Sequence, residues 1–207
     1  MQYPQSNWGY MSVPQKHADD RELNYSRGKG LGGSSLINMC AYTVGPKDDY
    51  DRWAAEVGDD HFNWENAVRM RKNIESYDNA VADKNRKYAA PDMSTHGTDG
   101  PLRIEYPMVW ETPIAETIDA AEECGLGTNL DINSGNPLGL SSSTATSRSG
   151  RRVTAAAAYL SDVPDNLSIV TEAQVTKIVF EGKKAVGVMA NGEECTRRSH
   201  APGQPSY

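Results

Sequence analysis

The chain has 207 residues, a formal net charge of −7, and leucine, isoleucine, valine or phenylalanine at only 33 positions. This length predicts one domain or little more, and a share of about 16% for these four residue types is low for a self-sufficient core. The acidic balance and the scattered basic residues argue against nucleic-acid binding. No apolar run is long enough for a membrane span or a secretory signal. We therefore expect no nucleic-acid or membrane partner. The location stays unknown: it is cytoplasmic by default for this chain, with secretion of a full-length form as the alternative.

Cysteine and histidine are sparse and dispersed along the chain. The cysteines are Cys40, Cys124 and Cys195, and the histidines are His17, His61, His96 and His200. No C-x-x-C pair is present, and no histidine lies at ligand spacing from a cysteine. We expect reduced thiols, no metal site, and histidines that lie at the surface or cap helices.

The first half of the chain predicts irregular segments around one helix. Residues 1–27 are polar and predict extended or irregular chain. Residues 83–100 end in a run of turn formers and predict a surface loop before a short strand at 102–104. From Trp64 onward apolar residues recur every three or four positions, which predicts a helix capped by Asn63. The residues on its predicted apolar face are Ala67, Met70, Ile74, Tyr77 and Val81.

The second half predicts two more helices and a small sheet. Thr112 followed by Pro113 predicts a helix start, Gly125 predicts its end, and the alanine run 155–158 predicts another helix. Residues 126–150 are rich in Gly, Ser, Thr and Asn, which favours either a binding loop or disorder. Three β-branched segments predict an antiparallel meander, broken off by an unstructured tail at 193–207. The segments are residues 167–171, 175–180 and 185–190.

Residues 28–33 contain the pattern G-x-G-x-x-G. In a dinucleotide-binding turn a buried strand leads into the glycines, but residues 19–26 contain no apolar run, so we disfavour a Rossmann first turn. Gly32 and Gly33 allow close approach of the backbone to a flat or anionic ligand, with Ser34, Ser35 and Asn38 as polar groups beside it. A plain glycine turn is the alternative.

The stretch from Arg27 to Asn38, R-G-K-G-L-G-G-S-S-L-I-N, closely resembles the first signature of the glucose-methanol-choline (GMC) oxidoreductases. Further elements resemble motifs of that family in the family's order, so that the resemblance covers about residues 8–190. These elements are Trp8-x-Tyr10, Pro14-Gln15, Trp64, His96-Gly97 with Gly100-Pro101, Asp131-Ile132-Asn133, Gly139, Gly150-Arg151-Arg152, Ala157-Ala158-Tyr159-Leu160 and the segment 167–188.

The resemblance implies an α/β fold, here an α+β fragment. It implies part of a GMC-type FAD-binding domain and part of the substrate domain, with an antiparallel β-meander near the C-terminus. Residues 1–62 would carry the signature as a flavin lid loop, and 63–150 would be helices and loops shared by the FAD-binding and substrate domains. Residues 151–192 would be a helix and the meander of the FAD-binding domain, and 193–207 a tail unlike the family.

The resemblance also implies FAD as the cofactor and eight residues that bind it. The residues are Gly32, Gly33, Ser34, Asn38, Met39, Cys40, Ala41 and Val175. The first three would contact the pyrophosphate region and the next four would border the flavin ring. The last would bind the adenine through its backbone. An ordinary buried strand position is the alternative for Val175.

The activity implied is oxidation of an alcohol by hydride transfer to the flavin, assisted by a histidine base. None of the histidines matches the family's catalytic position, so no catalytic residue is assigned. We expect the family's first dinucleotide motif and its catalytic region to lie outside this chain, and hence little flavin to be retained on purification. The alternative is an inactive remnant that acts as a binding or interaction module. The alcohol, the electron acceptor and the oligomeric state stay open.

Overall fold

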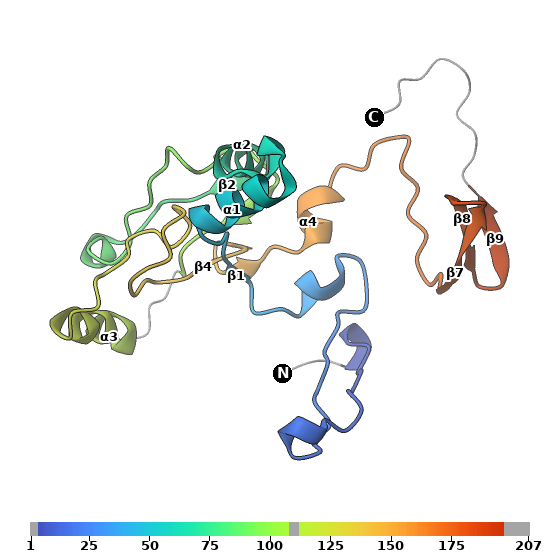
Figure 1. Ribbon diagram of the computed structural model, residues 1–207, viewed down its shortest axis with the longest axis horizontal. Helices are drawn as coiled ribbons and strands as arrows, with labels where there is room; N and C mark the ends of the chain where they lie inside the picture. Colours follow the sequence, from blue (N-terminus) through green and yellow to red (C-terminus); the bar gives the residue numbers. More distant parts are fainter. Residues whose placement is uncertain (1–3, 108–111, 197–207) are drawn as a thin grey trace. The chain divides into compact units, whose positions relative to one another are not determined.

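The structure is a computed structural model, and it describes residues 4–107 and 112–196 (Figure 1). The chain divides into two compact units, Met1–Val163 and Pro164–Tyr207. The first unit contains helices, short strands and loops, and the second contains a small sheet and loops, so the chain as a whole confirms the predicted mixed α/β character. Within the described residues no helix combines the length and the apolar composition that crossing a bilayer requires.

The first unit carries all the α-helices among the described residues and several very short strand pairs. The helices are α1 (Lys47–Val57), α2 (Trp64–Ile74), α3 (Thr112–Glu123) and α4 (Ala155–Tyr159). The strands are β1 (Ala41–Tyr42), β2 (Glu75–Tyr77), β3 (Leu102–Ile104), β4 (Thr144–Ala145), β5 (Ser147–Arg148) and β6 (Arg151–Arg152). β1 pairs antiparallel with β4, β5 antiparallel with β6, and β2 parallel with β3.

Residues 4–28 form an irregular hairpin, drawn in dark blue in Figure 1. Isolated antiparallel bridges link Asn7 to Gly28, Met11 to Asn24 and Gln15 to Arg21. The predicted irregular chain is thereby confirmed for the described part of this segment. No regular strand occurs between residues 4 and 28, so the glycine cluster does not follow a buried strand. A Rossmann first turn is excluded here on that ground.

Helix α2 begins where the sequence predicts and ends earlier. The Asn63 side chain accepts a hydrogen bond of 2.9 Å from the Asn66 N–H, so the predicted N-cap is confirmed. The helix ends at Ile74, and Tyr77, which was expected on its apolar face, lies in strand β2. The apolar spacing therefore continues through a change from helix to strand.

The face that α2 buries is also different from the predicted one. Met70 is 53% exposed and Ile74 is exposed, whereas Trp64 and Arg71 are the buried side chains of this helix. The prediction is wrong because apolar periodicity takes no account of a charged side chain. Arg71 is turned inward by acceptors that come from distant loops.

The core of the first unit is small and combines aromatic with aliphatic side chains. Its buried residues are Tyr77, Val81, Ala89, Ile104 and Tyr106, and the rings of Tyr77 and Tyr106 meet edge to face at 6.4 Å. Aromatic side chains bury large areas, which offsets the low aliphatic content. Much of the remaining buried volume is polar, including the network described below.

Helix α3 and the loop after it follow from local chemistry. The helix begins at Thr112, just before Pro113, and Gly125 takes a left-handed conformation (φ +84°) after its last turn, as predicted. The loop 126–150 is ordered by its own hydrogen bonds, among them Asn129 N–H to the Leu140 carbonyl at 2.8 Å. Disorder was one of the two alternatives for this loop, and it is wrong.

The second unit is an antiparallel sheet of β7 (Val175–Glu181), β8 (Lys184–Ala190) and β9 (Glu193–Thr196), drawn in the orange and red part of Figure 1. A meander is confirmed, but it is shifted by one strand. Residues 167–171 form no strand, and residues 193–196, which were assigned to an unstructured tail, pair with β8. The remainder of that tail lies outside the described residues.

The turn between β8 and β9 explains this difference. Asn191 (φ +50°) and Gly192 (φ +84°) both take left-handed conformations, which return the chain in a tight hairpin. Backbone hydrogen bonds then form the strand although Glu193 and its neighbours are polar, because the ladder does not depend on apolar side chains.

Replacing Ile104 by alanine is expected to lower the free energy of unfolding of the first unit by about 2–5 kcal/mol, because this side chain is fully buried and the substitution leaves a cavity. Leu138→Ala, at a side chain that is 78% exposed in the same unit, is the matched control and should change it by less than about 0.5 kcal/mol. Urea unfolding followed by tryptophan fluorescence measures both, since every tryptophan lies before residue 164. Equal losses in the two variants would contradict the assigned core.

Candidate functional site

Seven of the eight predicted FAD-binding residues lie in one continuous loop, residues 32–41, in the first unit. The eighth, Val175, is the first residue of β7 in the second unit. Its side chain is 49% exposed, so the alternative of an ordinary buried strand position is wrong. The loop is therefore the part of the predicted site that can be described as a unit.

The loop begins with a turn that only glycine can form without strain. Gly32 (φ +92°) and Gly33 (φ +55°) both have positive φ and lead into a 3₁₀-helix, Gly33–Leu36. A Cβ at Gly28 would lie 2.1 Å from the Gly33 carbonyl oxygen, so the residue that packs against the turn at position 28 must also be glycine. A Cβ at Gly33 would meet nothing within 4 Å, so this residue faces open space.

The serine hydroxyls of the loop hold the turn together. Ser34 Oγ accepts a hydrogen bond of 3.1 Å from the Gly28 N–H. Ser35 Oγ donates to the Gly32 carbonyl at 2.5 Å and accepts from the Ala155 N–H at 2.9 Å. Ser35, which was expected to offer a polar group to a ligand, is therefore committed to the protein's own backbone.

The segment from Asn38 to Ala41 is exposed on its outer side and held from behind. Met39 is 94% exposed, and Asn38 and Ala41 are also exposed. Cys40 has a left-handed backbone (φ +61°), and its carbonyl accepts from the Thr146 N–H at 2.8 Å. The thiol of Cys40 is free, as are those of the other two cysteines, in agreement with the predicted reduced state.

The composition of this loop fits FAD. An open glycine position allows a pyrophosphate or a flat ring to approach the backbone closely, and the exposed stretch after it carries short polar and apolar side chains. A cleft of about 480 Å³ opens beside Cys40 and is bordered by Glu105 and Arg152. The loop thus presents one free face, while its other contacts are satisfied within the protein.

Glu105 is a fixed anion in the wall of that cleft. Its carboxylate accepts hydrogen bonds of 2.9 Å from the Ser147 hydroxyl and from the backbone N–H groups of Ser149 and Gly150. Partial burial would raise the pKa of Glu105, but the hydrogen bonds outweigh it and hold the pKa below its usual value. The side chain is therefore ionised at neutral pH.

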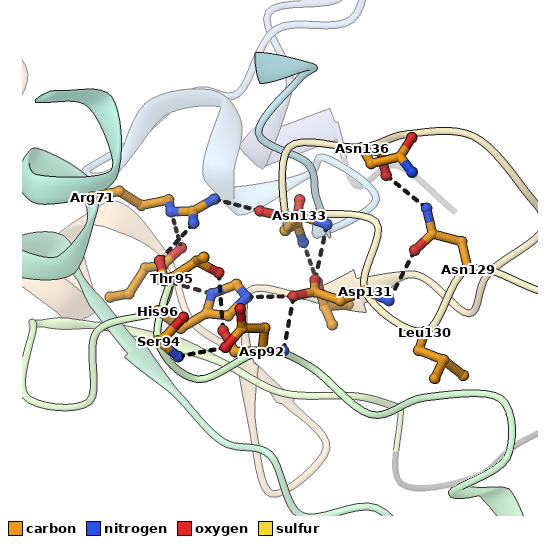
Figure 2. Close-up of polar contacts among 12 residues, drawn as sticks. Arg71, Asp92, Ser94, Thr95, His96, Asn129, Leu130, Asp131, Asn133 and Asn136 are labelled. Carbon is orange, nitrogen blue, oxygen red and sulfur yellow. Dashed lines mark hydrogen bonds and ion pairs between the residues drawn. The ribbon is translucent and has the colours of Figure 1, made fainter. Parts of the chain in front are cut away.

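A buried ionic network surrounds His96 (Figure 2). His96 is 3% exposed; its Nδ1 lies 3.0 Å from Glu75 Oε2 and its Nε2 lies 3.1 Å from Asp131 Oδ2. The expectation that His96 is a surface or capping residue is wrong. Both ring nitrogens face carboxylates, so both donate and the ring is an imidazolium.

The titration of these groups follows from their pairing. Burial alone would lower the pKa of His96, but the hydrogen bonds to Asp131 and Glu75 outweigh burial and raise it. Burial likewise would raise the pKa of Glu75, but the hydrogen bonds from His96 and Tyr42 and the nearby Arg71 lower it. The pairing thus favours the charged forms of His96 and Glu75, and neither nitrogen of His96 is free to act as a base.

Arg71 extends the network to two loops. Its guanidinium donates to the Asn133 carbonyl at 2.8 Å and to the Thr95 carbonyl at 2.6 Å, as Figure 2 shows, and its Nε lies 3.3 Å from Glu75. The Tyr42 hydroxyl donates to Glu75 at 2.7 Å. The network therefore joins α2, β2, two loops and the last residue of β1.

Periodicity and composition gave no sign of this network. The only signals in the sequence were the family-like motifs at residues 96–101 and 131–133, in which His96, Asp131 and Asn133 prove to be buried. Gly97 belongs to the same arrangement, since a Cβ there would lie 2.1 Å from the Lys72 carbonyl oxygen.

Comparison with known proteins agrees with the loop and the fold. The family model described as GMC oxidoreductase matches residues 10–204. An alcohol dehydrogenase [acceptor] from Pseudomonas putida is 36% identical over 185 residues, which are 88% of this chain and 31% of that protein. The chain thus spans about a third of the length of this relative.

Solved structures give the same result. Pyridoxine 4-oxidase from Mesorbium loti superposes with a TM-score of 0.78 at 28% identity, over 92% of this chain and 37% of that one. An FAD-dependent oxidoreductase from Chaetomium thermophilum superposes with a TM-score of 0.81 at 27% identity, over 89% and 32% of the two chains.

The fold is part of the fold of FAD-dependent oxidoreductases. The chain belongs to the GMC oxidoreductase family, and FAD is the cofactor that this membership implies. The family match continues to residue 204, so the prediction of a tail unlike the family is wrong for residues 193–204.

The raised pKa of His96 makes the stability of the first unit depend on pH. Folded His96 keeps its proton above pH 6.5, where the unfolded chain has lost it. The contribution of His96 to the free energy of unfolding is therefore fully present below about pH 6.5 and decreases as the pH rises toward the raised pKa. The expected slope is up to about 1.4 kcal/mol per pH unit. Urea unfolding at several pH values should show this slope in the wild type and not in His96→Gln.

If His96→Gln does not fold, the nitrogen NMR spectrum of the wild type shows directly whether folded His96 is protonated. Two protonated ring nitrogens for His96 at pH 7.5 are expected, and a neutral ring would contradict the assigned imidazolium.

Gly28→Ala is expected to displace the loop, because the new methyl group would overlap the Gly33 carbonyl. We expect a loss of about 1–3 kcal/mol in the free energy of unfolding and faster amide exchange over residues 28–41. Gly127→Ala is the control, since a Cβ there meets nothing within 4 Å. Similar exchange in both variants would show that the turn does not require glycine.

Proposed function

We propose that this chain supplies the flavin-covering loop of an enzyme that oxidises alcohols with FAD. The observation that carries the proposal is the loop 32–41, which is exposed on one face and held by hydrogen bonds on the other. A loop with this arrangement is preorganised for a ligand, so little ordering is needed when the ligand binds.

The proposed roles follow the order of the loop. Gly32, Gly33 and Ser34 contact the pyrophosphate region, where the open glycine position lets the anion approach the backbone. The exposed stretch after them borders the flavin ring, and the backbone of Val175 binds the adenine. The ring-bordering residues are Asn38, Met39, Cys40 and Ala41.

When bound, FAD supplies the acceptor for the hydride that leaves the alcohol carbon. The protein groups near the loop shape the approach to it. The cleft at Cys40 leaves one side of the loop accessible, and Glu105 keeps a fixed negative charge in the wall of that cleft. The alcohol as substrate class is supported by the similarity to the alcohol dehydrogenase of Pseudomonas putida. His96 is not assigned as the base, because both of its nitrogens are bound to carboxylates.

Binding is tested by titrating the purified chain into FAD and following the quenching of flavin fluorescence. Gly33→Asn should weaken binding at least about tenfold, because asparagine tolerates the positive φ but fills the open face. Gly182→Asn is the matched control, with φ +61° and nothing within 4 Å in the hairpin of the second unit, and should bind as the wild type does. Binding that Gly33→Asn leaves unchanged would contradict the proposed pyrophosphate contact.

The reaction is tested on the FAD-loaded holoenzyme by anaerobic bleaching of the flavin with benzyl alcohol and with aliphatic primary alcohols. Because the catalytic region is expected outside this chain, bleaching with formation of the aldehyde is expected for a holoenzyme that includes that region. A folded protein that binds no FAD and bleaches with no alcohol would instead favour the interaction-module alternative.

A further inference from the structure

Arg152 contacts the loop 32–41, called the flavin loop below, from a position far along the chain. It is the last residue of β6, and its Nη1 donates to the Asn38 side-chain oxygen at 2.7 Å and to the Ser35 carbonyl at 3.2 Å. Both acceptors lie in the loop, one at the end of its 3₁₀-helix region and the other at the start of its exposed stretch. A single guanidinium thus spans the bend of the loop.

The residues after Arg152 hold the same loop. The Ala155 N–H donates to Ser35 Oγ at 2.9 Å, and a Cβ at Gly32 would lie 3.1 Å from the backbone nitrogen of Ala156. The loop therefore packs closely on the start of α4, where Thr154 caps the helix through its own hydroxyl. Because β6 pairs with β5, Arg152 is itself fixed at the backbone, with Ser147 as its partner in the register.

The bond from Arg152 to Asn38 is connected to Cys40, the one residue other than glycine in the loop 32–41 with a positive φ. The Asn38 side-chain oxygen that accepts from Arg152 also accepts from the Cys40 N–H at 3.2 Å. Cys40 has a positive φ of 61°, which a residue with a side chain adopts only when its surroundings hold it there. A fixed Asn38 side chain is one of those surroundings, and the bond from the Thr146 N–H to the Cys40 carbonyl is another.

We propose that Arg152 is a positioning residue for the flavin loop: its guanidinium fixes the Asn38 side chain and, through it, the left-handed backbone at Cys40. The link to flavin rests on the proposed function, whereas the link to loop geometry does not. A charged donor suits this task, because a hydrogen bond from an ionised group is shorter and stronger than a neutral one. Arg152 is exposed, so removing its side chain breaks the bond to Asn38 without leaving a buried charge. The substitution should therefore affect the loop and leave the core intact.

The geometric part is tested by amide hydrogen exchange on the full 207-residue chain. In Arg152→Ala the Cys40 amide should exchange about ten times faster than in the wild type, and the amides of β2 and β3 should be unchanged. Arg152→Lys, which keeps the charge, should restore part of the protection. Arg151→Ala, at the exposed neighbour on the same strand, should behave as the wild type does. Equal Cys40 exchange in Arg152→Ala and Arg151→Ala would overturn the proposal.

The flavin part is tested by the FAD titration with the same variants. Arg152→Ala should weaken FAD binding several-fold, Arg152→Lys should bind with intermediate affinity, and Arg151→Ala should bind as the wild type does. If the wild type binds no FAD, the proposed function fails while the exchange result still decides whether Arg152 positions the loop. If exchange rises but FAD affinity is unchanged, Arg152 orders the loop without serving the cofactor, and the proposal as stated is overturned.

Discussion

The first unit depends on a buried imidazolium held between two carboxylates. His96 bonds Glu75 on one side and Asp131 on the other, and all three side chains are shielded from water. Ionised groups tolerate such burial only when each is paired, and removing one partner typically costs about 3–5 kcal/mol, because it leaves a charge without compensation. The pairing therefore fixes the relative positions of β2, the loop around residue 96 and the loop around residue 131.

The loop 32–41 is held in place from both sides. At its far end, Tyr42 bonds Glu75 through its hydroxyl, and its carbonyl accepts from the Asn133 side chain at 3.3 Å. On the other side, Arg152 and the start of α4 hold Ser35 and its neighbours. The ionic network and the 152–156 segment thus leave only the outer face of the loop open.

Local chemistry was sufficient for the parts of the fold that depend on a few adjacent residues. Asn63 as a helix cap, Thr112-Pro113 as a helix start and the strand at 102–104 were predictable, because caps, prolines and short apolar runs act within a few residues of themselves. The apolar face of α2 was not predictable, because what Arg71 contacts lies as far away as Asn133. The shift of the meander has the same origin: whether residues 167–171 or 193–196 form a strand is decided by pairing partners.

The sequence by itself determined the family, the glycine turn and the loop that carries the predicted FAD contacts, because these are written in a continuous run of residues with specific backbone requirements. Only the tertiary structure decided that His96 is a buried ion, that Ser35 is used for anchoring, and that Arg152 reaches Asn38 across 114 positions of the chain. The physical reason is that the cost of burying a polar group depends on its partners, and those partners are brought together by folding.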